Sequence, residues 1–99
     1  MTTIEARQAA EASLESLIAS AQALPTSEAT EAFLHECMAL RLAIRAFHME
    51  AIRFRMFNVD RMITRQSVSL AEDGMQAFAD VRRQLEAAGF HTRSHQAPS

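Results

Sequence analysis

The feature that most limits how this chain can fold is the stretch from Glu28 to Gln66, which contains neither glycine nor proline. Its apolar residues keep a helical spacing throughout. Because nothing in it interrupts a helix, the stretch predicts one central helix of about 38 residues, about 57 Å long at 1.5 Å per residue. Globular helices average about a third of that length, so a second element must run beside this one.

A shorter helix is predicted on the N-terminal side of the central helix. Thr2 and Glu5 have the spacing of a capping box, in which each side chain accepts a hydrogen bond from the other residue's backbone amide. Apolar residues then recur with helical spacing up to Pro25, which ends the helix because its ring cannot continue the hydrogen-bond ladder. Thr26 or Ser27 caps the central helix.

A second short helix is predicted after the central one. Ser69 and Glu72 repeat the capping-box spacing and open a helix that runs to about Ala88. Gly89 followed by Phe90 is typical of a Schellman stop, in which glycine adopts the left-handed conformation and the next apolar residue folds back on the last turn.

These signals predict an all-α fold of three helices, short, long and short, in a single domain over residues 1–90. Residues 91–99 have no pattern and are predicted to be a disordered tail. The composition agrees, because the chain is 48% hydrophobic, has only two glycines and two prolines, and contains neither tryptophan nor tyrosine. Short loops make both short helices antiparallel to the central one. Three such helices enclose little core, so we expect an antiparallel bundle completed by dimerisation.

Two apolar stripes run along the predicted central helix. The first alternates gaps of four and three residues, the spacing of a coiled-coil seam, and is the predicted partner or dimer seam. Its members are Phe33, Cys37, Leu40, Ile44, Phe47, Ala51 and Phe54. The second stripe lies on a different side of the helix and consists of Leu34, Met38, Leu42, Met49, Ile52, Met56, Val59 and Ile63. One stripe holds the chain's own flanking helices and the other needs a second chain; the spacing leaves open which is which.

Charge is distributed unevenly along the chain, although its net value is only −2. Residues 1–40 hold six glutamates and one arginine, whereas residues 41–65 hold six arginines, one glutamate and one aspartate. Two antiparallel central helices that cross near residues 44–47 set the acidic start of each beside the arginine-rich end of the other. These residues are Glu28, Glu31 and Glu36 at the start and Arg53, Arg55, Arg61 and Arg65 at the end. The pattern therefore favours an antiparallel homodimer.

Four basic residues lie between the two apolar stripes of the central helix: Arg41, Arg45, His48 and Arg55. In one interpretation they pair with Glu11 and Glu15, or with acids of a partner, and their stems cover apolar surface. In the other interpretation they form an anion-binding pocket for a phosphate or a carboxylate ligand.

The sequence contains no pattern typical of an active site, a metal site or a cofactor site. A di-iron bundle needs Glu-x-x-His pairs, but neither His35 nor His48 has a glutamate three residues before it. Cys37 lies on the apolar seam and is interpreted as a small core residue. His91 and His95 are four residues apart, but they fall in the predicted tail and are interpreted as incidental. We therefore predict no enzyme activity, no metal and no cofactor.

Membranes and nucleic acids are not expected partners. The longest uncharged run, residues 16–27, is far shorter than the ~20 residues that span a bilayer. Double-stranded nucleic acid is not expected because the net charge is negative, lysine is absent and the arginines stand among apolar residues. A single cysteine forms no internal disulfide, which points to the reducing cytoplasm.

The sequence therefore favours a small helical protein–protein interaction module, such as an adaptor, an inhibitor or a chaperone-like protein. We expect it to act as a homodimer that presents helix surface to a second protein, whose identity the sequence does not give. The alternative is a ligand- or nucleic-acid-responsive regulator that uses the cluster Arg41, Arg45, His48 and Arg55.

Overall fold

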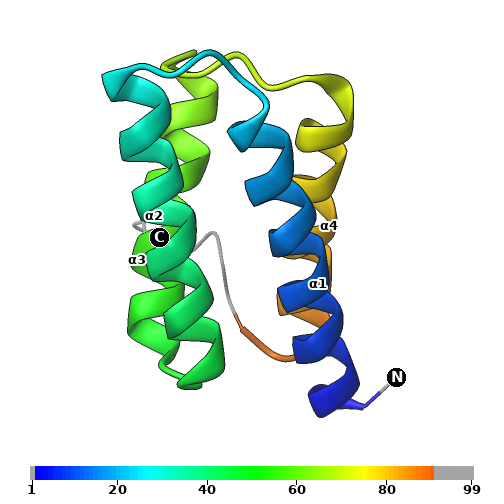
Figure 1. Cartoon of the computed structure of the whole chain (residues 1–99). Coiled ribbons are helices and arrows are strands. Elements are labelled where there is room, and N and C mark those ends of the chain that lie inside the picture. Colours follow the sequence, from blue (N-terminus) through cyan, green and yellow to red (C-terminus); the bar gives the residue numbers. More distant parts are fainter. Residues whose placement is uncertain (1, 91–99) are drawn as a thin grey trace.

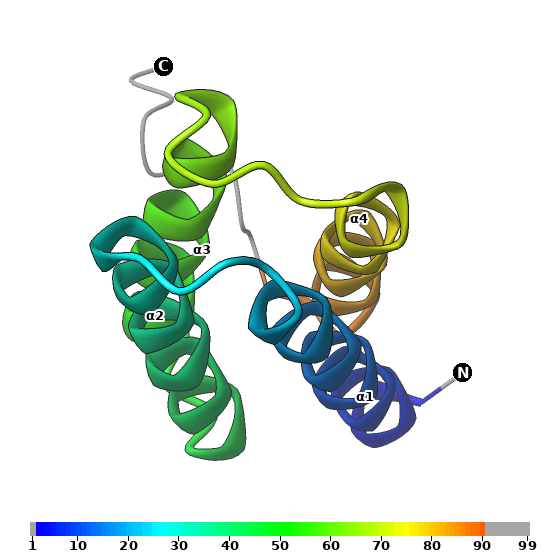
Figure 2. The ribbon, with the colours of Figure 1, turned by 45° about the horizontal axis from the view of Figure 1, so that its top comes forward.

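The computed structural model describes residues 2–90, which form α1 (Thr3–Gln22), α2 (Glu28–Arg45), α3 (Met49–Thr64) and α4 (Glu72–Ala87). The helices run alternately up and down (Figure 1). α2 packs between α1 and α3, and α1 packs between α2 and α4 (Figure 2). The prediction of an all-α fold is confirmed. The prediction of three helices is wrong, because the described residues form four.

The difference lies in the middle of the predicted central helix, where the chain reverses direction. Phe47 adopts a left-handed conformation, with φ of 57°. Its N–H donates to the carbonyl of Ile44, and the N–H of His48 donates to the carbonyl of Ala43, each at 3.1 Å, which together form a Schellman motif. The Nδ1 atom of His48 then accepts a hydrogen bond from the N–H of Ala51 at 3.1 Å and caps α3. The break has no sequence signal because phenylalanine stands where such motifs usually have glycine.

This turn exchanges the roles of the two apolar stripes. The first stripe is fully buried on α2, at Phe33, Cys37, Leu40 and Ile44. On the far side of the turn the same stripe reaches the surface, where Phe47 is 46% exposed and Phe54 is 45% exposed. The second stripe does the opposite, because Leu42 is 66% exposed whereas Ile52, Met56 and Val59 are fully buried. Since α3 reverses direction, the side of it that continues the α2 core stripe points away from the core.

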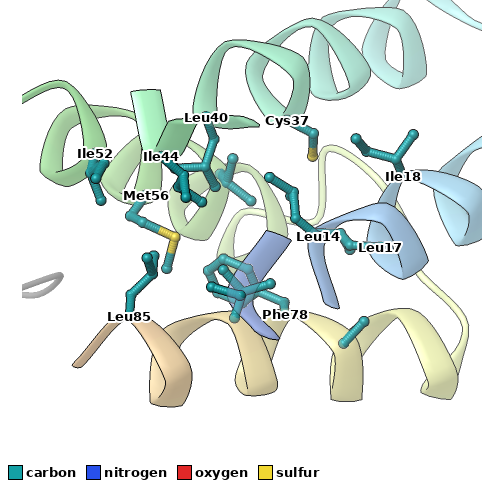
Figure 3. Close-up of a cluster of buried hydrophobic side chains, with 14 of the residues drawn as sticks. Leu14, Leu17, Ile18, Cys37, Leu40, Ile44, Ile52, Met56, Phe78 and Leu85 are labelled. Carbon is teal, nitrogen blue, oxygen red and sulfur yellow. The ribbon is translucent and has the colours of Figure 1, made fainter. Parts of the chain in front are cut away.

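All four helices contribute to one buried core (Figure 3). Its largest fully buried side chains include Leu14 and Leu17 of α1, Leu40 and Ile44 of α2, Ile52 and Met56 of α3, and Leu85 of α4. The chain's own α3 and α4 thus complete the bundle, which was expected to need a second chain. Burial of this apolar surface is the main force that holds the four helices together.

Two of the predicted helix ends near α1 are confirmed. Thr2 and Glu5 form the capping box, with hydrogen bonds of 2.9 and 3.0 Å between each side chain and the other residue's backbone N–H. Ser27 caps α2 by accepting a hydrogen bond from the N–H of Thr30 at 3.1 Å. α1 itself ends at Gln22, before Pro25 is reached.

The predicted capping box at the start of α4 is wrong. Ala71 is the N-cap residue, and no side chain caps this helix. Packing against α1 sets the start of α4 instead: Ser20 donates a hydrogen bond to Asp73 at 3.2 Å, and Gly74 lies against the Ser20 side chain. A β-carbon added at Gly74 would lie 2.5 Å from the Oγ atom of Ser20, so any larger residue would force the Ser20 side chain to move.

The predicted stop of α4 is confirmed. Gly89 has φ of 98°, and the N–H of Phe90 donates to the carbonyl of Leu85 at 2.9 Å. Phe90 folds back and is buried. Residues 91–99, which were predicted to be a disordered tail, lie outside the described residues.

Candidate functional site

Arg41 and Arg45 connect α2 to α1. The Nη1 atom of Arg41 lies 2.8 Å from Oε2 of Glu15, and the Nε atom of Arg45 lies 3.0 Å from Oε1 of Glu11. The interpretation that these two arginines pair with Glu11 and Glu15 is therefore confirmed. Both pairs are partly exposed to water, so each contributes at most about 1 kcal/mol to stability.

Arg55 lies on α3 and reaches α2 on the side opposite to Arg41 and Arg45. Its Nη1 atom donates to both carboxylate oxygens of Glu36 at 3.1 Å, and Asn58 donates to the same carboxylate at 3.2 Å. The side chain of Glu36 is only 16% exposed, so this is the most shielded ion pair in which the four basic residues take part. The acidic start of α2 thus meets an arginine of α3 within one chain, where the charge pattern had suggested a meeting between two chains.

The structure does not bring the four basic residues together. Arg41 and Arg45 bind carboxylates on the α1 side of α2, and Arg55 binds a carboxylate on the α3 side. His48 accepts a backbone hydrogen bond at the turn. Each guanidinium already has a carboxylate partner, so the geometry does not form the anion pocket that was considered from the sequence.

The predicted seam is divided between the core and the surface. Phe33, Cys37, Leu40 and Ile44 are fully buried inside the chain. Burial raises the pKa of the Cys37 thiol to about 12, with a smaller contribution from the nearby charge of Glu36, so this thiol stays protonated at neutral pH. Ala51 is half-buried, and Phe47 and Phe54 are exposed. The seam therefore offers no continuous surface to a partner.

Phe47, in the turn between α2 and α3, belongs to a small aromatic contact. Its ring lies 5.9 Å from the ring of Phe90, measured between centroids, and the guanidinium carbon of Arg7 lies 4.2 Å from the Phe47 centroid. This contact joins α1, the turn and the end of α4. Sequence reasoning missed it because the three residues are far apart in the chain and no spacing rule connects them.

One face of α2 carries a row of five residues, four exposed and one half-buried, with spacings of three, four, four and three. We call this row the α2 stripe: Glu31, Leu34, Met38, Leu42 and Arg45. At 100° per residue its members lie within an arc of about 80° on the helix surface. Leu34 is half-buried, Met38 is 38% exposed and Leu42 is 66% exposed. The three apolar residues belong to the second stripe predicted from the sequence. Met38 and Leu42 are exposed, whereas Leu34 also packs against the core.

An open groove lies between α3 and α4. It is lined by Asp60, Met75, Phe78, Ala79, Arg82, Arg83 and Glu86. Arg82 reaches across it, with its Nη2 atom 3.4 Å from Oδ2 of Asp60 and its guanidinium carbon 5.2 Å from the Phe78 ring centroid. Arg82 thus joins α4 to α3 across the groove, whereas Arg83 pairs with Asp80 of its own helix.

Residues 2–90 do not gather three metal-ligating side chains at any one point, and none of their helices is long and apolar enough to cross a bilayer. His91 and His95, the pair with metal-like spacing, lie outside the described residues. No protein-family model matches the sequence, and neither a curated protein nor a solved structure matches the chain.

Proposed function

We propose that this protein is a helical protein–protein interaction module that acts as a homodimer, with the α2 stripe as the surface where two copies meet. The observation that carries the proposal is the symmetry of the stripe. Read from Met38 in either direction, it has an apolar residue after four positions and a charged residue after seven. The two charged ends are opposite in sign, Glu31 on one side and Arg45 on the other.

Such a row is complementary to itself when two copies of α2 run antiparallel. Met38 then meets Met38 of the second copy, and Leu34 meets Leu42. Glu31 of each copy approaches Arg45 of the other, which favours this direction over the parallel one. Arg45 already binds Glu11 through its Nε atom, but its side chain is 55% exposed and its guanidinium carries further N–H donors.

The contact has the composition of a small interface, with an apolar centre and a charged rim. Burial of a fully exposed leucine contributes about 1.5–3 kcal/mol, so Leu42 at 66% exposure contributes about 1–2 kcal/mol per copy. Met38, which is less exposed, contributes less, and its flexible side chain adapts to a symmetric contact. Association costs at least about 4 kcal/mol, which leaves a net of at most about 4 kcal/mol, so we expect a dissociation constant in the millimolar range.

A weak dimer of this kind suits an adaptor, an inhibitor or a chaperone-like protein, because a second protein can compete for the same helix face. We propose that the protein acts by binding rather than by catalysis. We propose the cytoplasm as its compartment, which the single buried thiol supports, since a reduced cysteine is what that compartment maintains.

Sedimentation equilibrium over a wide range of protein concentration tests the proposal. We expect a monomer–dimer equilibrium that Leu42→Glu shifts to monomer, because it places two carboxylates in the apolar centre of the contact. Met75→Glu is the matched control, since Met75 is also exposed, at 46%, but lies on α4 away from the stripe. Glu31→Arg should weaken the dimer, because the new arginine would lie near Arg45 of the second copy and the two positive charges would repel each other. A protein that stays monomeric at the highest concentration, or a dimer that survives Leu42→Glu, contradicts the proposal.

A further inference from the structure

The turn between α2 and α3 is held in a conformation that its residues do not favour. Phe47 has φ of 57°, and a bulky side chain is disfavoured in the left-handed region because of its β-carbon. No glycine or proline stands between Glu28 and Gln66, so nothing in the chain prevents residues 46–48 from continuing the helix. A short turn under strain between two helices that can join is the condition under which proteins exchange elements between copies.

The residues that join α2 to α3 would lie on one face if the two helices became one straight helix. Glu36 of α2 binds Arg55 and Asn58 of α3. In one straight helix, Arg55 lies about 100° and Asn58 about 40° round from Glu36, so all three face one side. A straight helix formed by residues 28–64 would therefore present the same residues to a partner along one face.

The register of these contacts is also symmetric about the turn. Glu36 and Asn58 each lie eleven residues from Phe47. Two straight helices that cross antiparallel at Phe47 thus bring Glu36 of each copy to Asn58 and Arg55 of the other. The resulting dimer contains two four-helix bundles. Each bundle is formed by α1 and α2 of one copy with α3 and α4 of the other, and its core has the same contacts as the core of the single chain.

We propose that residues 46–48 are a hinge, and that two copies of this chain exchange α3 and α4 by straightening it. The exchange goes beyond the homodimer proposed above and uses a different surface. Met38, at the centre of the α2 stripe, lies about 160° round α2 from Glu36, so both contacts can form in one assembly. In the closed form, the stacking of Phe47 on Phe90 and the histidine cap of α3 oppose the exchange.

A disulfide across α2 and α3 tests the proposal directly. Glu36→Cys and Arg55→Cys are combined in a Cys37→Ala background, and the protein is refolded from urea at low and at high concentration before oxidation. A closed hairpin forms the bond within one chain, whereas an exchanged pair forms it between two chains, which a denaturing, non-reducing gel separates. We expect the interchain bond to increase with protein concentration during refolding.

Substitutions in the hinge supply the controls. Phe47→Gly and Phe47→Ala both remove the ring contacts. Only glycine accepts the left-handed conformation and disfavours a straight helix. We therefore expect at least about tenfold less interchain disulfide with Phe47→Gly than with Phe47→Ala. Gln66, which follows α3 and lies outside the hinge, also has a left-handed φ of 60°. Gln66→Gly should therefore relieve strain there and leave the ratio of interchain to intrachain disulfide unchanged. His48→Ala removes the cap of α3 and should increase exchange.

Two results would overturn the proposal. One is an intrachain bond alone at every concentration, with His48→Ala included. The other is an interchain fraction that is equal in Phe47→Gly and Phe47→Ala. Adding Leu42→Glu separates this proposal from the previous one, because that change disrupts the α2 stripe and leaves the hinge intact.

Discussion

Gly74→Ala tests the close approach of α4 to α1, and its effect follows from the geometry. An added β-carbon would lie 2.5 Å from Oγ and 3.1 Å from Cβ of Ser20, and 3.3 Å from Cδ2 of Leu70. The Oγ atom can move by rotation, which breaks its hydrogen bond to Asp73 at a cost of about 1 kcal/mol. The Cβ atom of Ser20 cannot move without a shift of the helix, and such overpacking costs about 1–3 kcal/mol.

The same substitution also has a favourable part, since alanine in place of glycine stabilises a helix by up to about 1 kcal/mol. We therefore expect a net loss of about 1–3 kcal/mol, which lowers the Tm of a chain this size by roughly 4–24 °C. Thermal unfolding followed by circular dichroism measures this shift.

A double-mutant cycle with Ser20→Gly provides the control. Removal of the Ser20 side chain leaves room for the new β-carbon, so the two changes together should be more favourable than their separate effects predict, by about 1 kcal/mol or more. A Gly74→Ala protein that melts above the parent, or a cycle with no coupling, would refute the packing of α4 on α1 described here.

Two further predictions concern buried groups on α2. Glu36→Gln should destabilise the protein by about 1 kcal/mol in urea melts, because it removes the charge that binds Arg55, whereas the exposed Glu31→Gln should have little effect; equal effects would contradict the shielded pair. Cys37 should resist thiol reagents at pH 8 in the folded protein and react in urea. Folding raises the pKa of Cys37 from about 9 to about 12, so the thiol's contribution to stability is complete below pH 9 and is lost as the pH rises from 9 to 12. Cys37→Ala should therefore flatten the pH dependence of stability in that range.

Local signals in the sequence were enough to find three of the helix ends. Thr2 with Glu5, Ser27 and Gly89 each act through neighbours within a few residues, so their roles can be read directly from spacing. Ser69 has the same kind of signal, but Gly74 packed against α1 decides where α4 begins. The contact between α1 and α4 joins residues more than fifty positions apart, so local spacing in the sequence does not reveal it.

The candidate site was harder to predict, because it depends on the turn at Phe47. Turn rules look for glycine or asparagine at a left-handed position. Phenylalanine is not among the residues that these rules associate with a turn. Without the turn, the stripe that contains Leu40 and Ile44 appeared to be a dimer seam, although the chain's own helices cover it. The pairing of Arg41 with Glu15 was accessible from sequence, since it depends only on α1 and α2 lying side by side.

The self-docking of α2 is tested most directly by a disulfide at its proposed symmetry axis. In a Cys37→Ala background, Met38→Cys places one new thiol at the centre of the stripe in each copy, where antiparallel docking brings the two thiols together. We expect mild oxidation at millimolar protein concentration to give a covalent dimer in high yield, and much less with the exposed control Met75→Cys. Equal, low yields from the two positions would contradict the proposed contact.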